Sequence, residues 1–325
     1  MSGPAIDDAA GLGPKYIRAM RRGLKAMECP AGTKVLVTDN FVEDVQRVSG
    51  DRGYDTARGA TGVVAAKTLH LADGSHLIVV NAAVADTMRA ARFERLLAHE
   101  TGHVLINERG EVPAGVSMAP EFGEPALRAL AAASLDEYRA EAAVCRRGLG
   151  PDPGVSAEDA GDTAAHLNLD VCEAVVTPEG GNDPVAFAAA ILSAQNWSSV
   201  KLAYLAAAVN SGELPGGVED LPAEHRADWD DYIAPTWEAR LAAYLAVPDA
   251  LEPMSATALT AAVDRLAGVE RNCLRSMGFE YRIDGAEVGF YRTGADALFM
   301  DRMDRAREEL ARIHAADDDG AVDRA

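Results

Sequence analysis

Two histidines and a glutamate stand in the sequence at a spacing that suits a metal ion. His99, Glu100 and His103 form the pattern His-Glu-x-x-His. In a helix, residues four positions apart lie one turn apart on one face, so both imidazoles can reach the same ion. Glu100 is rotated by about 100° from His99, which places it beside the water that the metal would activate. We therefore expect Zn²⁺ bound by His99 and His103, with Glu100 as the general base.

The competing interpretation is that these three side chains only satisfy local hydrogen bonds. The chain has just seven histidines, so a chance match to the pattern is uncommon. The other faces of the same segment are apolar, and a glutamate is rarely buried on such a helix without a partner. The metal-binding interpretation is therefore favoured.

A hydrolytic zinc site takes three protein ligands and leaves one position for water. The metzincin continuation fails, because Ile106 and Arg109 stand where it needs glycine and histidine. Glu137 and Glu141 repeat the four-residue spacing in a later helical segment. We interpret Glu137 as the third ligand and Glu141 as the acceptor of a hydrogen bond from a ligand histidine. Exchanged roles, or Asp136 as the ligand, remain alternatives.

The segments 99–103 and 137–143 together resemble zinc metallopeptidases of the gluzincin type, in particular the ImmA/IrrE-like peptidases. That family pairs a His-Glu-x-Gly-His helix with a later Glu-x-x-Ala-(Asn/Asp)-x-Phe-Ala helix. The resemblance implies that Glu137 is the third ligand. Glu141 stands at the Asn/Asp position, and Ala143 stands at the Phe position. The resemblance extends over about residues 60–146, and the strand ending at Asn81 resembles the family's strand beside the cleft.

The expected reaction is hydrolysis of a peptide bond in a protein or peptide substrate. The backbone of strand 76–81 would align an extended substrate by strand addition. A second electrophile should hold the developing oxyanion, and the candidates are Tyr138, His166 and Tyr204. The alternative function is a noncatalytic sensor or binding module that keeps a metallopeptidase fold.

Two further histidines, His70 and His76, flank an expected turn at Asp73-Gly74. We interpret them as surface residues of an edge strand. A second metal site is the alternative, since imidazole suits several transition metals.

The spacing of apolar residues along the chain predicts the helices and strands that position these side chains. Apolar residues recur at helical spacing over 88–106, which predicts one long helix after Asn81 that ends near Gly110. Before it we expect a strand at 34–38 and a hairpin formed by the apolar runs 61–71 and 76–80. The remaining elements expected are helices at 15–27, 40–48, 125–149, 156–175, 184–211, 224–246, 256–277 and 295–315, with a hairpin near 279–292 around Asp284-Gly285.

This pattern predicts an α+β fold. A zincin-like metallopeptidase domain, with a small sheet and the active-site helix, is expected over residues 1–150. A mostly α-helical domain is expected over residues 151–325.

The hydrophobic content, net charge and cysteines of the chain limit the kinds of function to be expected. Of the 325 residues, 48% are hydrophobic, which is enough to build cores. The 31 basic and 51 acidic residues give a net charge of −20, so nonspecific binding to nucleic acid or anionic membranes is not expected. No apolar run is long enough for a membrane span, and the first residues do not read as a secretory signal. The four scattered cysteines fit a reducing cytoplasm. Oligomeric state stays open.

Overall fold

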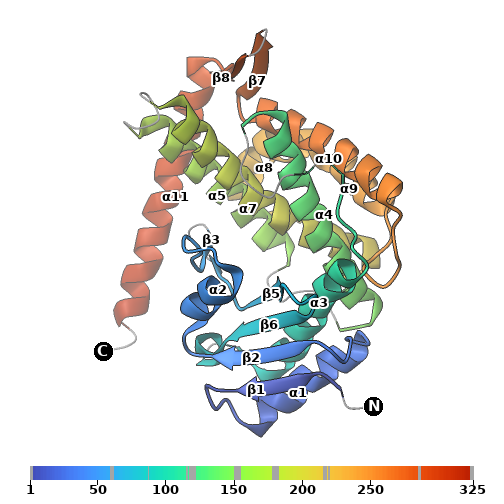
Figure 1. The fold of residues 1–325 in the computed structure, drawn as a ribbon. Coiled ribbons are helices and arrows are strands. Elements are labelled where there is room, and N and C mark those ends of the chain that lie inside the picture. The colour runs from blue at the N-terminus through green and yellow to red at the C-terminus, as the bar shows by residue number, and fades with distance from the viewer. Residues whose placement is uncertain are drawn as a thin grey trace.

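The computed structural model describes residues 3–58, 62–86, 88–114, 116, 122–149, 155–177, 183–214, 218, 220–284 and 287–322. It confirms the α+β class, with a small sheet in the N-terminal part of the chain and helices in the rest (Figure 1). Thr61, Gly285 and the expected domain boundary at residue 150 lie outside the described residues.

The main sheet has four strands in the order β1-β2-β6-β5. The first three run parallel, and β5 runs antiparallel to β6. Two helices connect the parallel strands along the chain, and a separate pair, β3 and β4, forms a two-stranded ribbon. The bounds are β1 (Ala5–Asp8), α1 (Pro14–Ala26), β2 (Lys34–Thr38), α2 (Phe41–Ser49), β3 (Ala57–Arg58), β4 (Gly62–Val63), β5 (Ala66–His70) and β6 (His76–Asn81).

The sheet packs helices on both faces, because alternate side chains of a strand point to opposite sides. Ile78 and Val80 belong to the core shared with α1 and with α3 (Ala90–Glu108). Val79, between them, belongs to the core shared with α2. Strand β1 is absent from the sequence prediction. Its four residues, AIDD, carry little apolar pattern, and it is defined by pairing with β2.

The expected motif helix is shorter than predicted at its start. A 3₁₀ helix, η1 (Ala82–Asp86), comes first, and α3 begins only at Ala90. The Asn81 side chain accepts a hydrogen bond from the backbone N–H of Ala83, which starts a separate turn there. The end agrees with the sequence prediction, since Gly110 follows α3 with a φ of +62°.

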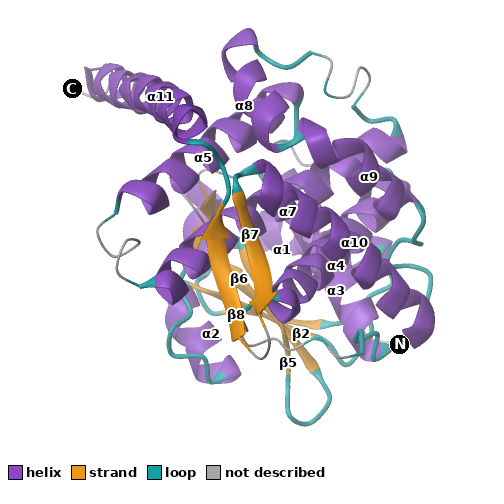
Figure 2. Ribbon diagram, turned by 90° about the horizontal axis from the view of Figure 1, so that it is seen from above, coloured by secondary structure: helices purple, strands orange, loops and turns teal. Residues whose placement is uncertain are grey.

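Among the described residues, the C-terminal half is helical, with one hairpin at the end of the molecule opposite the main sheet (Figure 1). Figure 2 views this hairpin from above, with its two strands in orange. The expected hairpin near 279–292 is confirmed as β7 and β8. The expected helix at 224–246 is instead divided into η2, α8 and α9, and Pro235 stands in the first turn of α9, where a missing N–H costs nothing. The bounds are α4 (Glu124–Arg146), α5 (Ala157–Val176), α7 (Pro184–Ser211), η2 (Ala223–His225), α8 (Arg226–Tyr232), α9 (Ala234–Leu245), α10 (Ala256–Ser276), β7 (Phe279–Asp284), β8 (Glu287–Arg292) and α11 (Asp296–Val322).

Helix α4 connects the two halves. It packs against α3 on the side of the sheet and against α7 and α10 within the helical part. Its residues Leu127, Leu135 and Tyr138 are members of the large apolar core of the helical half. None of the described helices is long and apolar enough to cross a lipid bilayer.

A buried ion pair lies inside that helical core. Arg240 of α9 and Glu270 of α10 are both fully buried, and one of their N···O contacts measures 3.0 Å. Gln195 and Ser199 of α7 also donate hydrogen bonds to the Glu270 carboxylate. The charge of Arg240 is therefore compensated entirely within the protein.

Replacing Glu270→Ala should destabilise the protein strongly, because it leaves Arg240 charged and unpaired in the core. We expect the free energy of unfolding to fall by about 3–5 kcal/mol, measured by chemical denaturation. The control is Arg307→Ala, which breaks a pair with Asp304 in which both side chains are mostly exposed. That variant should change stability by only about 0–1 kcal/mol. Similar effects of the two substitutions would contradict this view of the core.

Candidate metal centre

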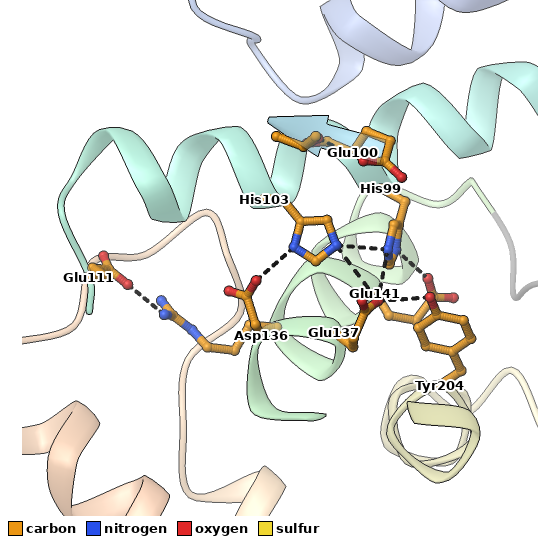
Figure 3. A network of polar contacts seen from close by, with 10 residues as sticks. His99, Glu100, His103, Glu111, Asp136, Glu137, Glu141 and Tyr204 are labelled. Atoms are coloured by element: carbon orange, nitrogen blue, oxygen red, sulfur yellow. Dashed lines mark hydrogen bonds and ion pairs between the residues drawn. The ribbon is translucent and has the colours of Figure 1, made fainter. Parts of the chain in front are cut away.

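The two histidines of the motif project from one face of α3 toward α4 (Figure 3). The Nε2 atoms of His99 and His103 lie 3.1 Å apart, and their ring centroids are separated by 4.8 Å. His99 is buried and His103 is half-buried. The one-turn spacing in the sequence thus brings both nitrogens to the same point.

Glu137 of α4 completes a group of three. Its Oε2 lies 3.2 Å from Nε2 of His99 and 3.6 Å from Nε2 of His103. Ligand atoms at bond lengths near 2 Å around a tetrahedral ion are about 3.3 Å apart, so the observed separations fit one ion. Among the described residues, these three form the one group of three or more histidine, cysteine or acidic side chains that could hold a metal.

The outer nitrogens of both rings are held by carboxylates. Nδ1 of His99 lies 3.1 Å from Glu141, and Nδ1 of His103 lies 2.8 Å from Asp136. An ionised carboxylate only accepts hydrogen bonds, so each Nδ1 must carry the proton and donate it. Glu141 is itself buried and paired with the buried Arg95.

This arrangement of donor atoms favours a cation at its centre. With both Nδ1 atoms protonated, the neutral rings turn the lone pairs of their Nε2 atoms toward each other and toward Oε2 of Glu137. Three electron-pair donors facing one point repel unless a proton or a metal ion lies between them. The donor set therefore fits a divalent metal ion.

The same geometry shifts the pKa values of the metal-free site. Burial lowers the pKa of His103, but the Glu137 and Asp136 carboxylates outweigh burial and hold that pKa well above its usual value. Burial raises the pKa of the Glu137 carboxyl, but His103 and His99 outweigh it and hold that pKa well below its usual value. Without metal, a proton on His103 therefore takes the place of the cation.

A glycine lets the two ligand helices come close enough. A Cβ atom placed on Gly102 would lie 2.8 Å from both the Cα and the Cβ of Ala140. Glycine inside a helix normally costs about 0.5–1 kcal/mol relative to alanine, and here it permits direct backbone contact between α3 and α4. The motif positions Gly102 and Ala140 thus set the distance between the histidines and Glu137.

Glu100 lies on α3 beside His99 but is not part of the group of three (Figure 3). The Thr68 hydroxyl of β5 lies 2.7 Å from the Glu100 Oε2 atom and 3.1 Å from its backbone oxygen. Glu100 is buried. Its carboxylate is thus oriented by the sheet and not by the metal ligands.

Among the three expected electrophile candidates, the structure brings Tyr204 to the site. The hydroxyl of this α7 residue donates a 2.8 Å hydrogen bond to Oε2 of Glu137, and its ring lies edge-on to His99. Tyr138 points into the helical core, where it accepts a hydrogen bond from Asn210 and stacks on Tyr244. His166 is hydrogen-bonded to the backbone of Asp162, and its ring packs against a tryptophan.

The prediction that strand 76–81 offers a free backbone to the substrate is wrong. This strand, β6, is paired on both sides, with β2 and with β5. The edge strands of the described sheet are β1 and β5, and β5 also contacts α3. The apolar run at 76–80 is typical of a strand that is covered on both faces. This run is the feature of the sequence that indicates an interior position for β6.

Three partners of the site were not assigned from the sequence. Arg95 stands four residues before His99, so both side chains lie on the same face of α3. Because His99 contacts Glu141, this spacing indicates that Arg95 can also reach Glu141, as the structure shows. The sequence offers Asp136 only as an alternative ligand, whereas the structure pairs it with Nδ1 of His103. Thr68 reaches Glu100 across 32 positions of the chain, and no local pattern points to it.

The expected surface role of the turn histidines holds for His70, which is exposed, but is wrong for His76. His76 is only 4% exposed, because the even-numbered residues of β6 face the layer of α1 and α3. Burial lowers the pKa of His76, and His70 lowers it further.

Comparison with protein-family models, curated proteins and solved structures finds no match to the chain.

Zinc binding to the metal-free protein should release a proton near neutral pH. Below its raised pKa, His103 carries a proton that the metal must displace. Zinc affinity should therefore fall about tenfold for each pH unit below that pKa and level off above it. Calorimetric titrations between pH 6 and 8, in buffers of different ionisation enthalpy, count the protons. The Asp136→Asn substitution removes one of the charges that raise the pKa of His103, so this variant should release fewer protons when it binds zinc. Proton-independent binding of zinc would contradict the assignment.

The Gly102→Ala substitution should force α3 and α4 apart. We expect zinc affinity to fall on the order of tenfold or more, as for other changes in ligand positioning, and stability to fall by about 1–3 kcal/mol. Gly268→Ala in α10 is the matched control, since a Cβ there meets nothing within 4 Å. It should leave zinc binding unchanged and stabilise the helix by up to about 1 kcal/mol. Equal zinc affinity in both variants would contradict the role of Gly102.

Proposed function

We propose that this protein is a zinc metallopeptidase that hydrolyses peptide bonds in a protein or peptide substrate. The observation that carries the proposal is the meeting of His99, His103 and Glu137 at one point, with Glu100 beside them on α3. Two imidazoles and one carboxylate form the donor set of catalytic zinc sites and leave a position open for water. Hard ions such as Ca²⁺ and Mg²⁺ prefer all-oxygen sets.

The proposed base is Glu100. When bound, zinc supplies Lewis acidity, which activates a water molecule and polarises the scissile carbonyl. Glu100 accepts the proton that the water loses and later delivers it to the leaving amine. Thr68 holds one oxygen of the carboxylate by its hydrogen bond, which leaves the other oxygen for the proton. A base fixed in this way needs no reorientation during the reaction.

Tyr204 is the proposed oxyanion donor. Its hydroxyl lies at the metal centre, where it donates to the ligand oxygen of Glu137. With substrate bound, the hydroxyl can turn its single proton away from Glu137 and donate it instead to the negative charge that develops on the substrate carbonyl oxygen. Because Tyr204 belongs to α7, the helical half contributes directly to the site.

The edge strand β5 is the proposed docking site for the substrate backbone. One side of β5 pairs with β6, while its other side is not paired within the described sheet. An extended peptide added there would lie beside α3, which β5 contacts. Thr68 lies on β5 and donates a hydrogen bond to Glu100. The strand that aligns the substrate would therefore also orient the general base.

The proposed compartment is the cytoplasm. All four cysteines are free thiols, and Cys145, Cys172 and Cys273 are buried. Unpaired cysteines are typical of proteins in reducing compartments.

The Glu100→Gln variant tests the proposal. It should keep one zinc per chain and lose cleavage on the order of a thousandfold, because an amide cannot accept the proton. Cleavage is measured as new N-termini in an extract treated with the zinc-loaded protein. Glu94→Gln, on α3 but paired with Arg22, is the control and should cleave normally. Wild-type activity in Glu100→Gln contradicts the mechanism. A wild-type protein that binds zinc and cleaves nothing supports the noncatalytic sensor instead.

A further inference from the structure

A second pair of histidines lies at the turn between β5 and β6. His70 and His76 are direct partners in the antiparallel register, so their side chains stand on the same face of the sheet. Their ring centroids are 5.1 Å apart, close to the 4.8 Å between His99 and His103 at the metal centre. Two imidazoles at this spacing can share one ion.

One nitrogen of this pair has no partner. His76 is 4% exposed, and its Nδ1 atom is buried without a hydrogen-bond partner among the described residues. A buried polar atom left unpaired costs about 1–3 kcal/mol. His70, in contrast, is exposed and gives solvent access to the pair. The pair therefore combines an unsatisfied nitrogen with an open side.

The surroundings of the pair keep an imidazole neutral and include one nearby carboxylate. Residues at the even positions of β6 face the layer that contains α3, and α3 ends at Glu108. Burial and the neighbouring His70 lower the pKa of His76, which favours the neutral imidazole that binds metals, while the Glu108 carboxylate acts in the opposite direction. The C-terminal end of a helix also carries a partial negative charge. Glu108 is exposed, so its side chain is free to turn toward a bound ion.

We propose that His70 and His76 form a second metal site, which takes a divalent transition ion such as Zn²⁺, Ni²⁺ or Cu²⁺. Two imidazoles supply the protein ligands, and water fills the remaining positions. Nitrogen ligands select these ions over Mg²⁺ and Ca²⁺. With two protein ligands instead of three, this site binds more weakly than the centre at His99.

An ion at this site would cross-link β5 to β6. His70 is the last residue of β5, two positions after Thr68, which orients Glu100. The ion would therefore stiffen the edge strand that carries Thr68. Since it binds only the folded hairpin, it also stabilises the native state by mass action.

Counting metal equivalents tests the site independently of the proposed enzyme activity. Metal-free protein is titrated with Cu²⁺, the ion that imidazole sites bind most tightly among these. Wild type should bind two equivalents, while His70→Ala and His103→Ala should each bind one, and the double variant none. Lys67→Ala, an exposed residue of β5, is the control and should bind two. If His70→Ala binds two, or wild type binds only one, the second site is wrong. If His103→Ala binds two, the centre at His99 is wrong and the hairpin site is unaffected.

Thermal unfolding supplies a readout that does not depend on stoichiometry. Protein already loaded with one zinc is heated with and without excess Ni²⁺. The melting temperature of wild type should rise with Ni²⁺, and the rise should vanish in His70→Ala, whose exposed side chain is not needed for folding. An equal rise in both proteins would overturn the proposal.

Discussion

The site depends on three electron-pair donors that are forced to face one another. Nε2 of His99, Nε2 of His103 and Oε2 of Glu137 lie within 3.6 Å of one another. Both Nδ1 atoms donate to carboxylates, so two neutral rings turn only lone pairs toward this point. Such a cluster is unfavourable without a positive charge at its centre. The contact between Gly102 and Ala140 brings the two helices close enough to create it. A cation therefore belongs to the structure of the site itself.

The rest of the molecule holds these donors in place from several sides. Arg95 and Glu141 fix His99, and Asp136 fixes His103. Arg139 of α4, between Glu137 and Glu141 in the sequence, pairs with Glu111, just beyond the end of α3, which connects the two helices at a second point. Tyr204 contributes a hydrogen bond from α7. The candidate metal centre thus lies where the sheet-bearing part and the helical part meet. Any binding there and the packing between the two parts depend on the same residues.

The sequence was most informative where function requires short-range spacing. The four-residue intervals in α3 and α4 place His99 with His103, and Glu137 with Glu141, on single helix faces. The structure then brings those faces together at Gly102 and Ala140, which both stand at motif positions. The α+β class also followed from the change of periodicity along the chain.

Long-range relations could not be read from local patterns. The position of β6 inside the sheet depends on β2, which lies about forty residues earlier, and on the antiparallel partner β5. Likewise, the contacts of Thr68 with Glu100 and of Tyr204 with Glu137 join segments 32 and 67 residues apart. Nothing within one segment distinguishes Tyr204 from Tyr138, since only tertiary packing directs one hydroxyl to the site and the other into the core.

The most direct measurement is anomalous X-ray diffraction at the zinc absorption edge from crystals grown with one equivalent of zinc. We expect one dominant peak about 2 Å from Nε2 of His99, Nε2 of His103 and a carboxylate oxygen of Glu137. Zinc bound only elsewhere, or an ordered site without any metal, would contradict it.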